Sequence, residues 1–329
     1  MLDARQVATN SVMTGASSCV SCGETRASFV CEKPLAVGGR TKVVLDRCAA
    51  CDLVYQRGWA QTFEAELYDY YALRTEWPID RVYKAVNARR IEDLLEELGA
   101  QVPGRRLLDV GCGAGQLVFV AASSGWNARG IDLSEPAVAI GQRFGARCER
   151  LDFFAPELDG ERFDVIVMSE LIEHVPSPAR FLRRASDLLA DGGITYVTTP
   201  NFRSLSRHVI GMEWSVISPQ HISYFTPASF RRVVTEQTDL CVASIETRNM
   251  SPEAVERLTS VLRRTRAARA GASPPATSCA ATPARPPPDL RTRIAGSRLL
   301  RTAKHATNAV LDAASAGENL FAVLRKRAS

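Results

Sequence analysis

A glycine-rich turn directly after a short apolar segment constrains the fold of this chain more than any other feature. Residues 106–110, RLLDV, have the length and composition of a buried strand, and GCGAG follows at residues 111–115. Glycine adopts the backbone angles of tight turns and lets a ligand approach the main chain closely. A dinucleotide-binding fingerprint would place its third glycine at position 116, which is Gln. The spacing therefore argues against NAD and favours another nucleotide-like ligand.

Apolar segments and helical segments alternate along the chain after this turn. The expected strands are 106–110, 128–133, 147–153, 163–170 and 194–200. Helices are expected at 116–123 and 179–190 and after Ser134, and Gly192-Gly193 is expected to close the second of them. This alternation predicts an α/β fold in which helices cover both faces of a parallel sheet. Ligands bind such sheets beyond the C-terminal ends of the strands.

Acidic residues stand at the ends of the first three expected strands. Asp109 precedes the glycines, Asp132 ends the second strand, and Asp152-Phe153 follows the third. A carboxylate at the position of Asp132 can accept two hydrogen bonds from a ribose diol. Together with the glycines, these residues form a more specific pattern than the turn alone.

The motifs DVGCGAGQL, GIDLS, LDF and EHV resemble the successive motifs of class I S-adenosylmethionine (SAM)-dependent methyltransferases. The resemblance implies a Rossmann-like, seven-stranded sheet with an antiparallel last strand, and SAM as the cofactor. It implies these donor-binding residues: Asp109, Gly111, Gly113, Gly115, Asp132, Asp152 and Phe153. The glycines would surround the methionine and ribose, Asp132 would hold the ribose hydroxyls, and Asp152 with Phe153 would meet the adenine. Asp109 would order the turn.

The same resemblance assigns the C-terminal part of the chain. It predicts a sixth strand at 240–247 and a seventh at 319–326, inserted beside the fifth. Between them we expect a helix at 252–269, a proline-rich disordered excursion at 271–288 and a helix at 290–314. The residues expected to be buried in the last helix are Ile294, Leu299, Leu300, Val310 and Leu311.

Acid–base groups follow the fourth expected strand in the sequence Ser169-Glu170-Leu171-Ile172-Glu173-His174. This stretch resembles quinone-pathway O-methyltransferases, in which similar carboxylates surround a divalent ion. Glu170 and His174 are therefore candidate catalytic residues, and a divalent cation at the acceptor site is a candidate cofactor. The alternative is that Glu173 and His174 cap or pack the following helix.

A third candidate catalytic residue, His221, lies in the segment SPQHISYF. The pattern G-x-x-W…P-x-H-x-x-Y-F resembles a methyltransferase subgroup with an N-terminal zinc ribbon, which includes deoxysugar C-methyltransferases and enzymes of cell-surface glycan or secondary-metabolite pathways. The deoxysugar enzymes carry Tyr-x-Glu-His where this chain has Ser218 and Gln220. We expect His221 to act as a general base, because an ordinary imidazole titrates near pH 6.5. The alternative is a structural histidine in a loop.

Two Cys-x-x-Cys pairs precede the alternating region. Cys19 and Cys22 are separated from Cys48 and Cys51 by 25 residues, and short strands flank the second pair. Four thiolates suit tetrahedral zinc and leave no open position, so we expect a structural zinc ribbon. The alternative is two turns that hold free thiols. The expected domains are the ribbon at 1–60, a helical connector at 61–105 and the methyltransferase domain at 106–329.

Charge and hydropathy exclude several classes of function. Residues 251–329 carry 14 basic and 5 acidic side chains, whereas the remaining 27 basic and 31 acidic side chains give residues 1–250 a net charge of −4. The acidic body argues against a nucleic-acid partner. The basic part can touch a membrane surface weakly, or it is a solvated helix face. We expect a cytoplasmic location, because no signal peptide and no apolar run of about 18 residues is evident.

These features predict a methyltransferase that acts on a small molecule or a nucleotide sugar. Two other classes stay open. One is an RNA methyltransferase that grips RNA with its zinc ribbon, although the adenine-amino signature (N/D)-P-P-(Y/F) is absent after the fourth strand. The other is an inactive scaffold that binds SAM.

Overall fold

Two β-sheets organise the residues that the computed structural model describes, which are 18–34, 42–58, 76–269 and 298–327. The larger sheet has seven strands in the order β10-β11-β8-β7-β4-β5-β6. Their bounds are β4 Arg106–Val110, β5 Asn127–Asp132, β6 Cys148–Arg150, β7 Phe163–Ser169, β8 Leu189–Pro200, β10 Leu240–Arg248 and β11 Asn319–Lys326. Strands β4 to β8 are mutually parallel, and β11 runs antiparallel to both β8 and β10. The expected seven-stranded sheet with a reversed last strand is confirmed.

Strand order reverses at β4, which has β5 on one side and β7 on the other. The chain therefore leaves β4 in one direction and later returns to its opposite edge. A crevice forms at such a switch point, beyond the C-terminal ends of the strands. The glycine turn at 111–115 follows β4 directly, so the topology places it at this crevice.

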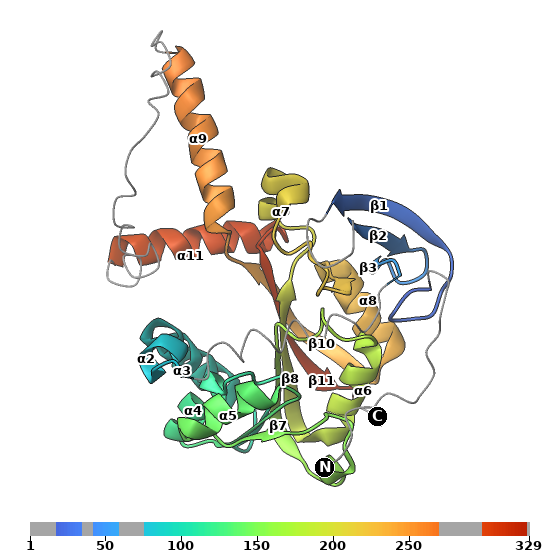
Figure 1. The fold of residues 1–329 in the computed structure, drawn as a ribbon, viewed down its shortest axis with the longest axis vertical. Helices are drawn as coiled ribbons and strands as arrows, with labels where there is room; N and C mark the ends of the chain where they lie inside the picture. The colour runs from blue at the N-terminus through green and yellow to red at the C-terminus, as the bar shows by residue number, and fades with distance from the viewer. Residues whose placement is uncertain (1–17, 35–41, 59–75, 270–297, 328–329) are drawn as a thin grey trace.

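Helices cover both faces of the sheet (Figure 1). The helices of the sheet domain are α3 Ala85–Gly99, α4 Gln116–Ser123, α5 Glu135–Arg143, α6 Pro178–Leu188 and α8 Pro227–Gln237, with the shorter α2 Ile79–Val82 and α7 Leu205–Ile210 and the 3-10 turns Pro156–Leu158 and Gly211–Glu213. Leu107 of β4 joins the core with α3 and α4, whereas its neighbour Leu108 joins the core with α6 and α8. Successive strand residues point to opposite faces, so β4 is apolar throughout because both faces are buried.

Two local expectations are wrong. Helix α6 ends at Leu188, and Gly192-Gly193 lies inside strand β8 instead of closing the helix. Phe163 pairs with Leu189 and Val165 pairs with Ile194, so the glycines take up an irregularity in the ladder, where Gly192 has a φ of 75°. The third strand is also shorter than expected, at Cys148–Arg150.

The segment between β10 and β11 contains two long helices, α9 Pro252–Arg269 and α11 Arg298–Ala313 (Figure 1). Helix α9 has the expected bounds. In α11, Leu311 is buried as expected, but Val310 is 70% exposed, so its predicted burial is wrong. The expected excursion at 271–288, and the side chains of Ile294, Leu299 and Leu300, lie outside the described residues.

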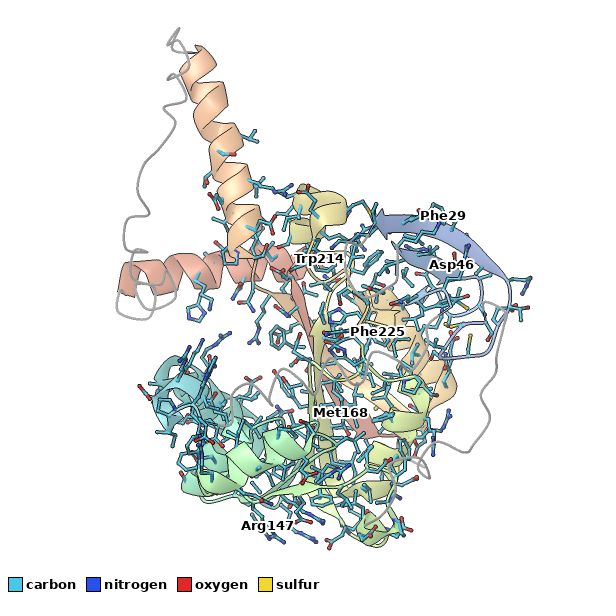
Figure 2. The ribbon with its side chains drawn as sticks, viewed as in Figure 1. Phe29, Asp46, Arg147, Met168, Trp214 and Phe225 are labelled. Atoms are coloured by element: carbon cyan, nitrogen blue, oxygen red, sulfur yellow. The ribbon has the colours of Figure 1, made fainter. Side chains whose placement is uncertain are left out.

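The N-terminal strands form a second sheet that includes a strand of the main body. Strands β1 Ala27–Pro34, β2 Lys42–Cys48 and β3 Val54–Gln56 are antiparallel, and β9 Ser223–Tyr224 pairs with the free edge of β3. Trp214 and Phe225, labelled in Figure 2, are buried among residues of both parts. We call residues 18–58 the ribbon. The domain boundaries at 60 and 105 stay predictions.

No helix in the described ranges is long and apolar enough to cross a membrane.

Candidate functional site

The glycine turn after β4 requires its glycines. Gly111, Gly113 and Gly115 all have positive φ, at 71°, 53° and 72°. A methyl group on Gly115 would lie 2.4 Å from the sulfur of Cys148, and one on Gly111 would lie 2.9 Å from Leu171. Larger side chains would therefore meet both backbone strain and collisions. The contact with Leu171 also brings the turn against the loop that follows β7.

Asp132 ties the glycine turn to the start of helix α5. Its Oδ2 accepts a hydrogen bond from the Gly113 N–H at 2.8 Å, and its Oδ1 accepts one from the Ser134 N–H at 2.8 Å. A carboxylate has about four acceptor positions, so two stay available for a ribose diol. The structure places Asp132 next to the turn, and its role toward ribose stays a prediction.

Asp109 is buried at the end of β4. It is only 4% exposed, and burial together with the nearby charge of Asp132 raises the pKa of its carboxyl to about 8. The carboxyl is therefore largely protonated at neutral pH while the site holds no cation. A cationic ligand next to it would favour the ionised form.

The third acidic position, Asp152, makes a hydrogen bond within its own turn. The Asp152 carboxylate accepts a hydrogen bond from the Phe154 N–H at 2.8 Å. Phe153 is 4% exposed, and its ring contacts the rings of Phe154 and Phe181 at centroid distances of 5.6 and 5.7 Å. Phe153 thus belongs to the core on one side of the donor crevice. A contact of Asp152 or Phe153 with adenine stays a prediction.

Tyr83 is a residue of the donor region that the motifs did not indicate. Its hydroxyl donates a hydrogen bond to the Ala114 carbonyl within the glycine turn. Its ring packs between Phe119 and Phe144. A pocket of about 280 Å³ lies beside Tyr83. Tyr83 precedes residue 106, where the motifs that resemble the methyltransferases begin. A single tyrosine before a helix carries no signal from which this contact could have been inferred.

Three acid–base side chains meet where the loop that follows β7 contacts the segment of His221. The ligand atoms of Glu173, His174 and His221 all lie within 4.8 Å of one another. We call these three residues the acceptor-site cluster. The rings of His174 and His221 meet edge to face at a centroid distance of 4.6 Å. The structure therefore brings together two of the three candidate catalytic residues, with Glu173 as the third member.

Backbone hydrogen bonds hold the two halves of the cluster together. The Glu173 carbonyl accepts from the N–H groups of Ile222 and Ser223 at 2.8 and 3.0 Å. His174 Nδ1 lies 3.0 Å from the Gln220 carbonyl oxygen, which fixes the orientation of its ring. These contacts explain the position of the SPQHISYF segment, which the sequence left as an isolated loop.

Burial keeps the cluster uncharged. Glu173 is 1% exposed, and burial with the charge of Glu170 raises its pKa well above the usual range. Burial lowers the pKa of His174, and burial with the neighbouring His174 lowers the pKa of His221 to about 3. The expected titration of His221 near pH 6.5 is therefore wrong, because that value holds for a solvated imidazole. A carboxyl oxygen and two neutral imidazole nitrogens form a donor set that suits a divalent cation.

Glu170 lies next to the cluster and not in it. It has a positive φ of 52°, an uncommon conformation for a residue with a side chain. Thr198 holds this conformation, since its carbonyl accepts from the Glu170 N–H at 3.0 Å and its hydroxyl donates to the Glu170 carboxylate at 2.9 Å. Burial, with the charge of Glu318, raises the pKa of Glu170. Thr198, Thr199 and Glu318 were not recognised in the sequence; the Thr199 hydroxyl donates to Glu173 at 3.0 Å.

The four ribbon cysteines converge on one point. The Sγ atoms of Cys19 and Cys51 are 3.5 Å apart, those of Cys22 and Cys48 are 3.5 Å apart, and those of Cys22 and Cys51 are 3.6 Å apart. Zinc–sulfur bonds of about 2.3 Å in a tetrahedron require sulfur–sulfur distances of about 3.8 Å. The cysteines therefore fit zinc with a small outward adjustment. Contacts with Cys19 and burial raise the pKa of Cys51, so a cation is needed to stabilise its thiolate.

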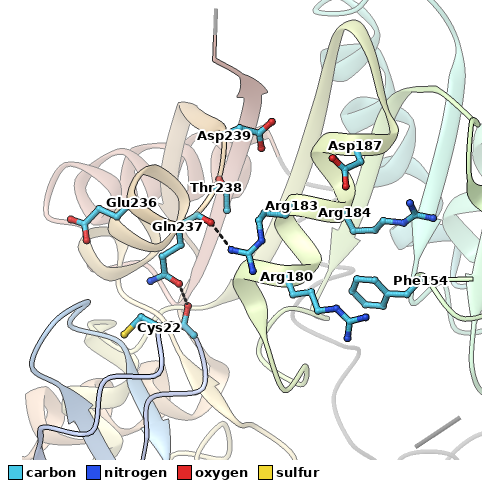
Figure 3. Close-up of a pocket in the computed structure, with 11 residues that line it drawn as sticks. Cys22, Phe154, Arg180, Arg183, Arg184, Asp187, Glu236, Gln237, Thr238 and Asp239 are labelled. Carbon is cyan, nitrogen blue, oxygen red and sulfur yellow. Dashed lines mark hydrogen bonds between the residues drawn. The ribbon is translucent and has the colours of Figure 1, made fainter. Parts of the chain in front are cut away.

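A pocket of about 890 Å³ lies elsewhere, where the ribbon meets α6 and the end of α8 (Figure 3). Arg183 donates to the Gln237 carbonyl at 2.7 Å, and the Ser21 hydroxyl donates to the Gln237 side-chain oxygen at 2.7 Å. Arg180 covers the Phe154 ring at 3.9 Å. None of the predicted catalytic residues lines this pocket. It lies at a contact between the ribbon and the sheet domain.

Comparison with known proteins places the chain in a family. Residues 83–244 match a methyltransferase domain family. The ubiquinone biosynthesis O-methyltransferase of Bordetella avium is 33% identical over 165 residues, which are 46% of this chain and 68% of that protein. The enzyme of the same name from Aromatoleum aromaticum is 32% identical over 169 residues, which cover 48% of this chain and 64% of that protein.

Among solved structures, the plantazolicin methyltransferase BpumL in complex with SAH is 17% identical, with a TM-score of 0.45 over 82% of this chain and 92% of that one. A SAM-dependent methyltransferase from Archaeoglobus fulgidus is 17% identical, with a TM-score of 0.46 over 79% of this chain and all of that one. The sequence relatives, the strand order and the glycine turn agree, and the chain belongs to the class I SAM-dependent methyltransferases.

Proposed function

We propose that this chain transfers a methyl group from SAM to an oxygen atom of a small molecule. The acceptor-site cluster of Glu173, His174 and His221 is the observation that most supports this proposal, because the loop that carries Glu173 and His174 also contacts the glycine turn through Leu171. The relatives named above are O-methyltransferases. The resemblance of the His221 segment favours a sugar or glycan precursor as the acceptor, in cell-surface glycan or secondary-metabolite biosynthesis.

Methyl transfer to a hydroxyl breaks one S–C bond, forms one O–C bond and releases the hydroxyl proton. SAM, when bound, supplies a methyl group that needs little further activation. The protein must align the acceptor, exclude water and remove the proton. Glu170 suits the last task, because burial raises its pKa and Thr198 fixes its carboxylate. His221 is too weakly basic to hold a proton at neutral pH, so we assign it to binding the acceptor oxygen or a cation.

A divalent cation fits the acceptor-site cluster. Glu173, His174 and His221 would hold it, and the cation would lower the pKa of an acceptor hydroxyl bound to it. The burial of Glu173 supports this assignment, because an acid this deeply buried otherwise has to keep its proton. Glu173 accepts a hydrogen bond on its carboxylate from the Thr199 hydroxyl and one on its carbonyl from the Ile222 N–H, and these hold its side chain and backbone in place.

We also infer a structural zinc ion at Cys19, Cys22, Cys48 and Cys51, and a cytoplasmic location. The fit of the four sulfur atoms to a tetrahedron supports the zinc assignment.

The proposal is tested by measuring SAH formation with a panel of hydroxylated acceptors that includes catechols and nucleotide sugars. The comparison pairs Glu173→Gln with Glu157→Gln, an exposed glutamate in a surface turn. We expect SAH only with an acceptor present, loss of activity in Glu173→Gln and full activity in Glu157→Gln. Calorimetry should show SAM binding in all three proteins. Equal activity of the two variants, or methylation of a nitrogen or carbon atom alone, would contradict the assignment.

A further inference from the structure

The edge of the ribbon is built into the segment that carries His221. Strand β9 follows His221 by two residues and pairs with β3, so that Val54 lies opposite Tyr224 and Tyr55 lies opposite Ser223. The Gln56 N–H donates to the Ile222 carbonyl at 2.9 Å. The ribbon is therefore bonded to the backbone of the acceptor site itself.

The opposite side of the same backbone is bonded to the loop after β7. While the Ile222 carbonyl accepts from Gln56, the Ile222 N–H donates to the Glu173 carbonyl. The backbone at Ile222 thus lies between Gln56 of the ribbon and Glu173 of the acceptor-site cluster. The backbone next to His221 is therefore bonded on one side to the ribbon and on the other to Glu173.

A second strand of the ribbon holds the chain upstream of His221. Lys33, on β1, donates from Nζ to the Trp214 carbonyl at 3.0 Å and to the Ile217 carbonyl at 2.8 Å. Trp214 is 1% exposed, so this turn is fixed in the core shared with the ribbon. Burial lowers the pKa of Lys33. The ribbon consequently holds the His221 segment on both sides, at 214–217 and at 222–224.

The cysteine site lies at the base of β3. Cys48 is the last residue of β2, and its N–H donates to the Leu53 carbonyl at 2.9 Å, one residue before β3 begins. Cys51 stands within the same turn. The turn that presents β3 is therefore the turn whose two sulfurs would bind zinc, and metal binding is coupled to folding in such sites.

We propose that the ribbon is a positioning module, in which zinc at the cysteine site fixes β3 and β3 holds His221 against His174 and Glu173. Loss of zinc would then disassemble the acceptor site and leave the donor turn intact. The proposal rests on the proposed function only in assigning His221 to the acceptor site. Lys33 and the Gln56 N–H are positioning groups, since neither belongs to the acceptor-site cluster.

The test measures the ring contact directly. In protein with isotope-labelled histidine, rings 4.6 Å apart should give a nuclear Overhauser effect between the His174 and His221 side chains. We expect this signal in zinc-loaded wild type and its loss after a chelator removes zinc. The signal of His305, which is exposed on α11, should not change.

Two pairs of variants separate positioning from general stability. Lys33→Met removes two hydrogen bonds to the His221 segment, whereas Lys42→Met removes an exposed ion pair with Glu32 in the same ribbon. Gln56→Pro removes the N–H that bonds to Ile222, whereas Gln56→Ala keeps it. The ring signal should be lost or shifted in the first member of each pair and kept in the second. SAM affinity by calorimetry should stay within about twofold in all four, as for changes away from the donor site.

Lys33→Met decides the outcome if zinc-free protein unfolds, because this variant retains every cysteine. An unchanged ring signal in folded Lys33→Met and in folded Gln56→Pro, each still containing zinc, would overturn the proposal. Loss of SAM binding together with the ring signal in Lys33→Met would overturn the proposal as well, because the ribbon would then stabilise the whole domain and not the acceptor site alone. The ring signal needs no acceptor, so a failure to find methyl transfer would contradict the proposed function and leave this result unaffected.

Discussion

The imidazole rings of His174 and His221 meet edge to face at 4.6 Å, although one follows β7 and the other precedes a strand of the ribbon sheet. Both histidines are half-buried, and desolvation lowers the pKa of both. Two neutral imidazoles next to a buried carboxyl are weak bases, but their nitrogens are good ligands for a divalent cation. The chemistry of the site therefore depends on a contact between parts of the chain that are distant in sequence.

The turnover of the enzyme should show no dependence on the titration of His221 in the neutral range. Because its pKa is lowered to about 3, the ring stays neutral from pH 5 to pH 9. We expect His221→Ala to lower turnover by about 10²–10³-fold, as for the loss of one group that binds the reacting oxygen, with little change in SAM affinity. His305→Ala is the control. A rate that rises around pH 6.5 in wild type and is lost in the alanine variant would contradict this and restore His221 as the base.

Asp109 should make the stability of the ligand-free protein fall as pH rises. Its folded pKa of about 8 lies above the unfolded value near 4. Between these values the unfolded chain has lost the proton that the folded protein keeps, so each rise in pH favours unfolding. We expect Asp109→Asn to match wild type near pH 4 and to exceed its unfolding free energy by about 3–5 kcal/mol near pH 8. Denaturant titrations at both pH values give the answer. A difference that is the same at both would show that Asp109 is already ionised in the folded protein.

Zinc should copurify with the protein at about one equivalent per chain. Changing Cys48 or Cys51 to Ser should remove the metal and lower the melting temperature, because metal binding and ribbon folding are coupled. Cys241→Ser, in β10, is the control and should keep both. Elemental analysis with calorimetry provides the measurement. Metal-free Cys48→Ser protein that melts like wild type would show that the four thiols are only packed together.

Asp132→Ala should weaken SAM binding by about 1–3 kcal/mol, because the ribose hydroxyls would lose a charged acceptor. The variant also removes acceptors for the N–H groups of Gly113 and Ser134, so part of the loss would come from a less ordered turn. Asp159→Ala removes an exposed ion pair with Arg184 and serves as the control. Unchanged affinity in isothermal calorimetry would mean that the donor site is assigned to the wrong carboxylate.

The sheet could be predicted because its signals are local. Each strand is an apolar segment with a clear end, the glycine turn indicates which strand end binds the ligand, and the family resemblance supplies the reversed strand at 319–326. The prediction for Gly192-Gly193 was wrong because glycine is common both after a helix and at a β-bulge. Only the pairing of β8 with β7 distinguishes these two positions. Val310 misled because its neighbour Leu311 takes the buried side of α11.

The acceptor site could be predicted only in part, because its assembly is non-local. Glu170, Glu173 and His174 form a recognisable motif, and His221 belongs to another. Nothing in the two residues of β9 indicates that they pair with β3, since so short a strand has no periodicity to detect. The depression of the His221 pKa follows from that packing, so a sequence argument falls back on the value for a solvated ring.

The place of β11 inside the sheet has a consequence for how the protein is made. Strand β11 lies between β8 and β10 but is translated after both, with residues 249–318 between β10 and β11. While a ribosome is still adding those residues, the nascent chain holds β8 with an open edge and β10 without its partner in the sheet. An open edge of this kind is a template for pairing with other chains. Leu320, Ala322 and Leu324, all fully buried in the folded protein, complete the core only when they emerge. The sheet therefore closes late in translation, and until then the nascent chain is exposed to aggregation and to capture by chaperones.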